Sequence, residues 1–476
     1  HASVSAGATN ERTGAVFPLK LSLEVVPEHF QEVIHFITHH DAVRQLNKII
    51  TNEEFRAAVR GVVGKNELNT LKPWLSDVAK AGRSTQNKSF IDAMFAQLRM
   101  GTTLGVMGFS TTTGVVQALG VFNSIAELGV KHTFEGYSLA INRGYVFKAV
   151  RDLMGSENDL QSGMEFALEK SKVLPYRIKT MDREMASVFR EIGQNVDIKS
   201  DSESVAGFAV NSVKALRRSK VLRKTQEVSM LHIAIIQMYS VDLPAWHAAY
   251  SKGISEWNDE ARAIRYADWT VENTQGSGAT KDMAALIRNQ SKIHTSFTMF
   301  MTFFSTFWNV TRGLGRDIAK GRVKPGAAAA KMAFLYFIPT FVEMLARDQF
   351  LDEDDEDEFD VLQRYLLRTA MYPAQSVPFF RDIASGATSD YGYSMNPVAG
   401  LLEKGVEGGR GLTLSAFDDS KDISLYQLKS TTRLMGAWLG VPGLSQVWRT
   451  GEHLYDVAVI GEDLTFKELS FGPKRE

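Results

Sequence analysis

Four histidines in the first helical stretch are the first residues that could do chemistry. His35 and His39 are four residues apart, so they share one helix face, where two imidazoles could bind one metal ion. The zinc-protease motif requires Glu directly after the first histidine, but Phe36 follows His35. His29 and His40 complete the group, and no third ligand can be named. We therefore expect a solvated or partly packed helix face and assign no metal ligand.

Glycine-containing segments do not form a phosphate-binding motif. Residues 275–281 (Gln-Gly-Ser-Gly-Ala-Thr-Lys) lack the Gly-Lys-Ser/Thr ending of such a loop, and Gly313 and Gly315 lack a third glycine at position 318. We expect a helix-joining loop at the first segment and a helix kink at the second. Glu203-Ser204 is similar to the start of a lytic transglycosylase motif, but its glycine-rich continuation is absent.

Other catalytic arrangements are also missing from the sequence. The chain has no cysteine, which excludes disulfides, thiolate zinc sites and cysteine nucleophiles. It has no Gly-x-Ser-x-Gly segment and no triad order that can be defended. We therefore predict no catalytic residue, no cofactor and no metal, and expect this chain to catalyse nothing by itself.

One predicted helix carries a dense stripe of positive charge. Six cations lie within eleven residues, and their spacing keeps most of them on one side: Lys214, Arg217, Arg218, Lys220, Arg223 and Lys224. Such a stripe can follow a phosphate backbone without reading bases, so these residues are candidate DNA contacts. The alternative is a solvated face that is paired with acids elsewhere. The acidic block 352–358 lacks the glycine that a calcium-binding EF-hand loop requires, and we expect a solvated loop or helix flank there.

Two stretches without charged residues are long enough to raise the question of a membrane. Met100–Ala126 has 27 uncharged residues, more than the roughly 20 that cross a bilayer. Its Gly101-x-x-x-Gly105 spacing suits close helix contact. Ile293–Thr311 has 19 uncharged residues, and Ala327–Ala346 could fold back on it as the second arm of a hairpin. Its aromatic residues are candidates for membrane or interface contact: Phe297, Phe300, Phe303, Phe304, Phe307 and Trp308. A lipid-facing role and a buried role both remain open.

Composition and periodicity indicate a mainly α-helical protein. The chain has 476 residues, of which 23% are charged and 44% hydrophobic, so several folded domains are expected. A net charge of -1 gives no overall attraction to nucleic acid. Only twelve prolines interrupt the helical periodicity, and only residues 19–25 alternate like a strand. We predict an elongated multi-helix assembly with a loop-rich C-terminal region and at most a minor β-hairpin near 17–26.

The expected domains follow shifts in composition. They are an N-terminal helical region (1–84), a helical domain with the uncharged Gly/Thr-rich run (85–196), a helical domain with the aromatic hairpin (207–350), and an acidic linker with the loop-rich C-terminal region (351–476). The polar segment 196–206 is the best candidate boundary. Because the chain starts at His1, we expect a segment of a longer polypeptide or a processed product.

A succession of segments in the third region resembles a known family. Ala-Arg-Ala-Ile-Arg-Tyr-Ala-Asp-Trp-Thr-Val (261–271) is followed by Thr274–Ser277, Lys281–Ala284 and the Phe297–Phe304 stretch. This order resembles the C-terminal large polyvalent protein-associated domain of very long phage and mobile-element polypeptides. Residues 101–129 are similar to an upstream part of the same proteins. The resemblance covers about residues 85–350, and its motifs are helical and structural.

The resemblance implies an internal virion protein, such as the ejection or inner core proteins of short-tailed phages. Such proteins leave the capsid with the DNA and form a conduit through the host envelope, or shield the DNA afterwards. The implied locations are the virion interior and then the host periplasm or inner membrane. The implied partners are further copies of the chain, other internal or ejection proteins, the portal or tail, phage DNA and the host membrane.

Two alternatives remain open. The chain could be a structural core protein at the portal that never contacts a membrane. It could also be the non-catalytic segment of a larger co-injected polypeptide, either an enzyme or an antirestriction protein. Because residues 293–346 carry more apolar surface than a short hairpin can bury, we expect a homo-oligomer.

Overall fold

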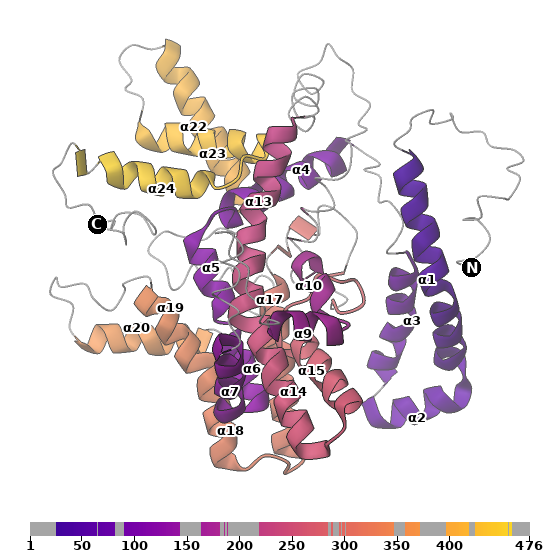
Figure 1. Ribbon diagram of the computed structural model, residues 1–476. Helices are drawn as coiled ribbons and strands as arrows, with labels where there is room; N and C mark the ends of the chain where they lie inside the picture. The colour runs from indigo at the N-terminus through magenta and orange to yellow at the C-terminus, as the bar shows by residue number, and fades with distance from the viewer. Residues whose placement is uncertain are drawn as a thin grey trace, which may run out of the picture. The chain divides into compact units, whose positions relative to one another are not determined.

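Every regular element in the described part of the chain is a helix (Figure 1). The computed structural model describes residues 25–63, 65–80, 90–142, 163–180, 185, 188, 219–283, 287–288, 295–296, 298–299, 301–346, 358–371, 397–417, 424–455 and 457–458. No strand occurs among them, so the prediction of a mainly α fold is confirmed. The alternating segment 19–25 lies outside these residues except for Val25, which begins the first helix.

The chain divides into two compact units. The first contains residues 1–93 together with residues 279–291, and the second contains residues 94–278 and 292–476. The chain therefore leaves the second unit after Gly278, returns to the first for a short segment, and goes back. The boundary expected at 196–206 lies outside the described residues.

The first unit is built on three helices, α1 (Val25–Thr51), α2 (Glu53–Val63) and α3 (Lys65–Lys80), which all pack on one another. Asn52 begins α2, because its side-chain Oδ1 accepts a hydrogen bond from the backbone N–H of Phe55 at 2.9 Å. Among the side chains that the structure describes in these helices, the buried apolar ones are those of Ile50, Leu68 and Leu75.

Two contacts attach the returning segment 279–291 to α3. The indole Nε1 of Trp74 donates a hydrogen bond to the carbonyl of Lys281 at 2.9 Å. The Nε of Arg288 lies 2.7 Å from Oδ2 of Asp77, and the Arg288 side chain is 5% exposed. A buried cation that is paired and hydrogen-bonded fixes the segment, because an unpaired one would be costly.

The second unit is organised around α14 (Leu243–Trp257), which packs against α15 (Glu260–Thr274) and α7 (Val130–Asn142). Small residues allow close contact, since a Cβ atom at Gly136 would lie 2.3 Å from the carbonyl oxygen of Pro244. The core on α14 also includes α9 (Gly163–Lys170) and the start of α10 (Leu174–Thr180). Preceding α14 are α13 (Lys220–Gln237) and a π-helical turn, η1 (Met238–Asp242).

The uncharged run Met100–Ala126 is not one membrane-length helix, which corrects one of the two possibilities left open for it. Chain turns at 108–110 and 119–120 divide it among α4 (Phe90–Met107), α5 (Thr111–Ala118) and α6 (Val121–Leu128). Most of its described side chains are buried. The run lacks charge because it lies in the interior of the protein.

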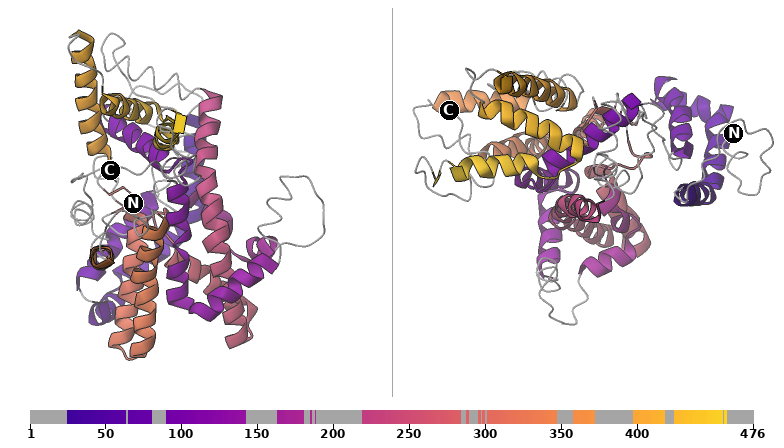
Figure 2. Two further views of the ribbon diagram at one scale, coloured as in Figure 1. Left: turned by 90° about the vertical axis from the view of Figure 1, so that its left-hand side faces the viewer. Right: turned by 90° about the horizontal axis from the view of Figure 1, so that it is seen from above.

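Residues 327–346 fold back beside the helix that precedes them. Helix α17 (Met301–Ala319) is followed by a turn at residues 320–324 and then by α18 (Pro325–Met332), the π-helical turn η2 (Ala333–Phe337) and α19 (Ile338–Ala346). The two arms lie side by side in the left view of Figure 2. The apolar contacts between them, to which α6 adds Ala126, involve Phe307, Leu314, Leu335 and Tyr336. Helix α17 continues through Gly313 and Gly315.

The C-terminal region contains more helix than its glycines suggested. A loop-rich region was expected here, but α22 extends over Pro397–Phe417 and packs along α23 (Leu425–Leu439). Its glycines serve this contact, because a Cβ at Gly408 would lie 2.8 Å from the carbonyl oxygen of Gln427. Two further helices are α20 (Glu358–Met371) and α24 (Leu444–Tyr455).

Candidate functional site

A buried ion pair fixes the loop that follows α15. The side chains of Arg177 and Asp242 are 3% and 0% exposed, and the Nε–Oδ2 distance is 2.9 Å. Arg177 also donates to the carbonyl of Gly276 at 2.5 Å, and the amide of Gln237 donates to Asp242 at 3.1 Å. The loop expected at 275–281 thus begins at a set of buried polar contacts. These groups pair with one another, so the arrangement is structural.

The amide of Gln275 continues this set. Its Nε2 lies within hydrogen-bond distance of the carbonyl of Gly120 at 3.1 Å and of Ser124 Oγ at 2.9 Å, while its Oε1 accepts from Gln237. These contacts connect α6, α13 and the end of α15. The segment Thr274–Ser277, part of the phage-protein resemblance, therefore has a packing role in this chain.

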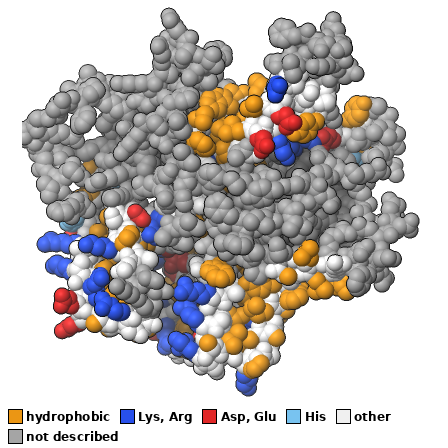
Figure 3. Space-filling model, turned by 180° about the vertical axis from the view of Figure 1, so that it is seen from behind, with side chains coloured by type: hydrophobic (Ala, Val, Ile, Leu, Met, Phe, Trp, Pro, Cys, Tyr) orange, Lys and Arg blue, Asp and Glu red, His pale blue; other side chains and the backbone are white. Residues whose placement is uncertain are grey.

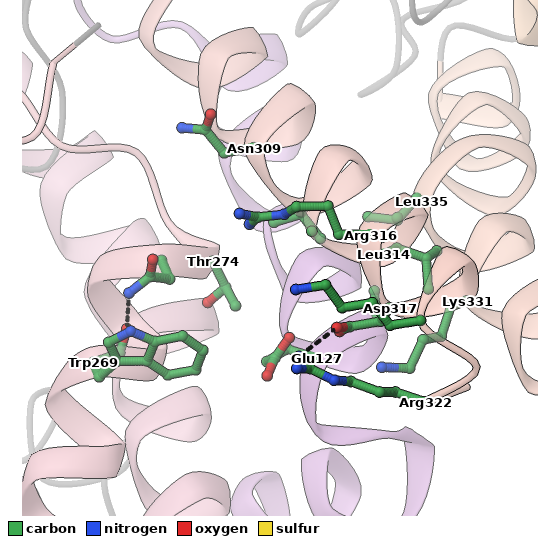
Figure 4. Close-up of a pocket in the computed structure, with 15 residues that line it drawn as sticks. Glu127, Trp269, Thr274, Asn309, Leu314, Arg316, Asp317, Arg322, Lys331 and Leu335 are labelled. Carbon is green, nitrogen blue, oxygen red and sulfur yellow. Dashed lines mark hydrogen bonds and ion pairs between the residues drawn. The ribbon is translucent and has the colours of Figure 1, made fainter. Parts of the chain in front are cut away.

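A solvent-accessible pocket opens beside this core, among α6, α15, α17 and α18 (Figure 4). Its volume is about 310 Å³, at the lower end of the range for small-molecule sites. Four cationic side chains line it, namely Arg316, Lys320, Arg322 and Lys331. The pocket follows from the hairpin, because the turn at 320–324 brings cations from both arms to one place.

The charge of the pocket is predominantly positive. Its two carboxylates are Glu127 and Asp317, and Asp317 accepts from Nη1 of Arg322 at 3.3 Å. In the described part of the chain, Arg316, Lys320 and Lys331 form no ion pair. Figure 4 shows the guanidinium groups of Arg316 and Arg322 extending toward the side of the pocket that α15 forms. Three of the four cations are thus available to an anionic ligand.

The α15 side of the pocket is aromatic and polar. The Trp269 side chain is 46% exposed, and the ring of Tyr266 stacks beside it with centroids 6.0 Å apart and an interplanar angle of 16°. The Asn273 side chain donates to the carbonyl of Trp269 at 2.8 Å. Burial raises the pKa of the Tyr266 hydroxyl to about 12, with the negative charges of Glu127 and Glu256 adding to the effect. Tyr266 is therefore neutral at physiological pH.

A second feature of the hairpin is its exposed apolar side. Among the described residues, two helical segments are long and apolar enough to cross a membrane, Lys220–Trp257 and Pro325–Val342. In the first, 61% of the most apolar part is buried, against 28% in the second. Hydrophobic side chains gather over α18 and α19 with Lys and Arg nearby (Figure 3). The exposed members include Met332, Phe337 and Phe341.

The structure locates only part of the predicted DNA-binding stripe. Lys220, Arg223 and Lys224 lie in the first two turns of α13 and are exposed. Lys214, Arg217 and Arg218 lie outside the described residues, as does the acidic block apart from Glu358. The stripe therefore remains a prediction, with three of its six residues on a solvent-accessible helix end.

The aromatic residues that were candidates for membrane or interface contact differ in their exposure to solvent. Phe307 is 2% exposed and packs against Tyr336 in the hairpin, whereas Trp308, the next residue, is 47% exposed. Phe303 and Phe304 belong to α17, and Phe297 and Phe300 lie outside the described residues. Neighbouring positions on α17 thus serve the core and the surface.

The histidines of α1 have mainly local contacts. Nε2 of His35 lies 3.1 Å from the carbonyl of Val78, and the rings of His35 and His39 stack with centroids 4.1 Å apart. The ring of His40 lies against that of Phe36. No group of three metal-ligating side chains occurs among the residues described.

The pocket residues were not predicted from the sequence, although the sequence contains one signal of them. Between positions 312 and 331 there are six cations and one acid, and Arg312, Arg316 and Lys320 recur every four residues. That pattern predicts a basic helix face. Trp269 and Asn273 had no comparable signal, because their place opposite α17 depends on tertiary packing. Comparison with models of protein families, with curated proteins and with solved structures finds no match.

Proposed function

We propose that this chain is an internal virion protein of a phage that leaves the capsid with the DNA and helps to form a conduit across the host envelope. The resemblance of residues 85–350 to phage polyvalent proteins supports the class of protein. The exposed apolar side of α18 and α19 supports the contact with a membrane. We place the protein in the virion interior and then in the periplasm or inner membrane of the host.

The observation that carries the proposal is the difference between the two candidate membrane segments. In the segment that contains α13 and α14, 61% of the most apolar part is buried, as in the core helix of a soluble protein, whereas only 28% of Pro325–Val342 is buried. Large exposed apolar patches mark protein or membrane interaction sites. A helix that is held on only one side can therefore transfer its other side to lipid without unfolding the unit.

The charges at the end of the hairpin favour an anionic bilayer. Lys320, Arg322 and Lys324 lie at the turn and are exposed, and Lys331 follows on α18. Each Lys or Arg near an anionic membrane surface contributes about 1 kcal/mol of attraction. The adjacent apolar helix and the cationic turn thus favour the same surface.

The partners follow from this role. We expect further copies of the chain, other internal or ejection proteins, and the portal or tail, with phage DNA passing without sequence-specific contacts. Lys220, Arg223 and Lys224 on α13 remain candidates for phosphate contact. We propose no catalytic activity for this segment.

Vesicle flotation tests the membrane contact without nucleic acid. Replacing Phe337, which is 45% exposed, with Ser should weaken binding to phosphatidylglycerol-containing vesicles about fivefold, since part of one aromatic side chain no longer enters the lipid. Phe134→Ser is the matched control, because Phe134 is 65% exposed on α7, a helix that does not belong to the hairpin. This control should bind like the parent protein.

Two results would oppose the proposal. If the parent protein does not float with anionic vesicles, the alternative of a portal core protein that never contacts a membrane is favoured. If Phe134→Ser and Phe337→Ser lose binding equally, the hairpin is not the contact surface. The other alternative, a segment of a larger injected polypeptide, is tested by sequencing the flanking reading frame for catalytic motifs.

A further inference from the structure

The pocket beside the turn of the hairpin combines two kinds of side chain on opposite sides. Helix α15 supplies the half-exposed indole of Trp269, and the hairpin supplies Arg316, Lys320, Arg322 and Lys331. Figure 4 shows the indole and the ends of Arg316 and Arg322 around the same open space. The proposed membrane contact uses some of these cations, but it has no use for the indole, which is neither in the core nor on the apolar face of α18 and α19.

We infer that this pocket binds a nucleotide unit with an unstacked base, as it occurs in a single strand of DNA or in a free nucleotide. An indole supports a base by stacking, and cations bind its phosphate. The ring of Tyr266 backs Trp269 on its own helix, which holds the indole in a defined orientation. The amides of Asn273 and Asn309 line the same pocket and offer hydrogen-bond donors and acceptors.

Duplex DNA fits the pocket less well. Its bases are stacked on one another, so only its phosphates could reach the cations, and the indole would have no partner. A simple anion would likewise leave the indole unused, and an uncharged aromatic molecule would leave three cations without a counter-charge. The nucleotide unit is the ligand class that uses both sides of the pocket.

Glu127 limits the affinity. Its carboxylate lies between the indole and Arg322 in Figure 4 and would repel a phosphate that approaches the cations. Asp317 forms an ion pair with Arg322 and so neutralises part of its positive charge. Weak binding without sequence preference is therefore expected, which suits a strand that must pass and not remain.

The inference rests on the proposed function for the source of the strand, which would be phage DNA during delivery. The two can fail separately, because the vesicle experiment contains no nucleic acid and the binding experiment below contains no lipid.

Fluorescence anisotropy of a labelled oligothymidylate measures binding by the full chain. Trp269→Leu should weaken binding about tenfold, within the range for loss of one stacked base, and Trp269→Phe should restore most of it. Trp308→Leu is the matched control, because Trp308 is 47% exposed on α17 but does not line the pocket. A circular dichroism spectrum and thermal melt like those of the parent protein show that each variant is folded.

The role of the cations in the pocket is tested with a second variant, which also has a matched control. Arg316→Gln with Lys320→Gln removes an exposed Arg and Lys four residues apart, and should reduce the salt slope for single-stranded DNA by about 1.4, or about 0.7 for each phosphate contact. Arg44→Gln with Lys48→Gln removes the same pair of residue types at the same spacing from α1 and should leave the slope unchanged. Glu127→Gln should tighten binding.

Competition distinguishes the two sources of the ligand. Thymidine monophosphate is compared with unlabelled oligothymidylate at the same total concentration of nucleotides. If the monophosphate displaces the labelled strand, a free nucleotide is supported as the ligand. If only the unlabelled oligothymidylate displaces it, a strand is supported. The inference is overturned if Trp269→Leu binds like Trp308→Leu, or if a duplex of equal length competes as well as the single strand does.

Discussion

Arg177 and Asp242 meet in the interior of the second unit although they are 65 residues apart in the sequence. The carboxylate is in the π-helical turn η1, and the guanidinium reaches from α10 to it and to the carbonyl of Gly276. Burying two charges is costly, and the cost is offset only when the pair and its remaining hydrogen-bond positions are satisfied. The pair therefore defines the position of the loop after α15 more than it adds to stability.

Removing one partner of this pair should be much worse than removing both. Arg177→Met leaves Asp242 charged and buried, so we expect a loss of about 3–5 kcal/mol in the free energy of unfolding. The double variant Arg177→Met with Asp242→Leu should be more stable than Arg177→Met alone. Urea unfolding of the parent protein and of both variants checks this. Equal stability of the single and double variants would show that the charges are not coupled.

A second prediction at this scale concerns the pH dependence of the first unit. Burial, followed by the nearby charge of His39, lowers the pKa of His35 in the folded state below its ordinary value of 6.5. The folded state then binds fewer protons than the unfolded state. The contribution of His35 to the free energy of unfolding is therefore fully present above about pH 6.5, and it is lost as the pH falls toward the pKa of His35 in the folded state.

Hydrogen exchange of the α1 and α3 amides at pH 7.5 and at pH 5.5 measures this effect. We expect faster exchange at the lower pH after correction for the intrinsic rate, and a smaller difference in His35→Asn. If the variant keeps the full difference, another group is responsible.

At the scale of elements, α4 shows how two glycines four residues apart have different roles. A Cβ at Gly101 would lie 1.6 Å from the carbonyl oxygen of Ala437 on α23, whereas a Cβ at Gly105 would have no atom within 4 Å. The side chain of Gln97 on the same helix donates to the carbonyl of Trp438 at 2.7 Å. Gly101 thus allows α4 and α23 to touch, and Gly105 faces open space.

The substitutions Gly101→Ala and Gly105→Ala should therefore change the free energy of unfolding in opposite directions. The first variant must separate two helices, and we expect a loss of about 1–3 kcal/mol, as in overpacked cores. The second replaces a poor helix former at an open position, and we expect a gain of up to about 1 kcal/mol. Urea unfolding curves measure both. A loss in both variants would mean that the Gly-x-x-x-Gly spacing acts as a single contact.

The helices were largely predictable from the sequence, but the turns that divide them were not. The helical period of residues 293–346 predicted the hairpin, because apolar positions at this spacing must face a partner. The turns within Met100–Ala126 were missed because no proline or charge marks them. One includes Phe109, which adopts a positive φ of 53° without a sequence signal. The length of α22 was missed because glycines normally weaken helices, whereas here they pack against α23.

The candidate site was less predictable than the fold. Arg316 and Lys320 belong to a readable basic face, but Trp269 faces them only because α15 and α17 pack together. The pairing of Arg177 with Asp242 is likewise a product of tertiary structure. One sequence shows which residues share a helix face, and it does not show which faces meet.

At the scale of the whole molecule, exposed apolar surface predicts self-association. On α20, Leu362, Leu366 and Leu367 are each 45–52% exposed, and Tyr365 of this helix contacts Phe341 of α19. The apolar surface of the hairpin is therefore continued by α20. Surfaces of this kind are usually covered by identical chains in closed arrangements.

Sedimentation velocity tests this expectation. We predict an oligomer in aqueous buffer and a smaller species when a mild detergent covers the apolar side chains. Leu362→Ser with Leu366→Ser should shift the protein toward the monomer in buffer. A strictly monomeric protein in both conditions would contradict the prediction.

The contact between α4 and the turn after α23 has a consequence for the order in which the chain can fold. The backbone N–H of Gly443 donates to the carbonyl of Leu104 at 3.1 Å, and Gln226 donates to the carbonyl of Gly440 at 2.7 Å. The contact between Leu104 and Gly443 closes a loop of more than three hundred residues, and such distant closures make folding slow. A chain that is threaded through a narrow opening, as the proposed function requires, cannot complete this unit until both Leu104 and Gly443 have emerged. Passage of the segment between these two residues and folding of the unit would then be successive events.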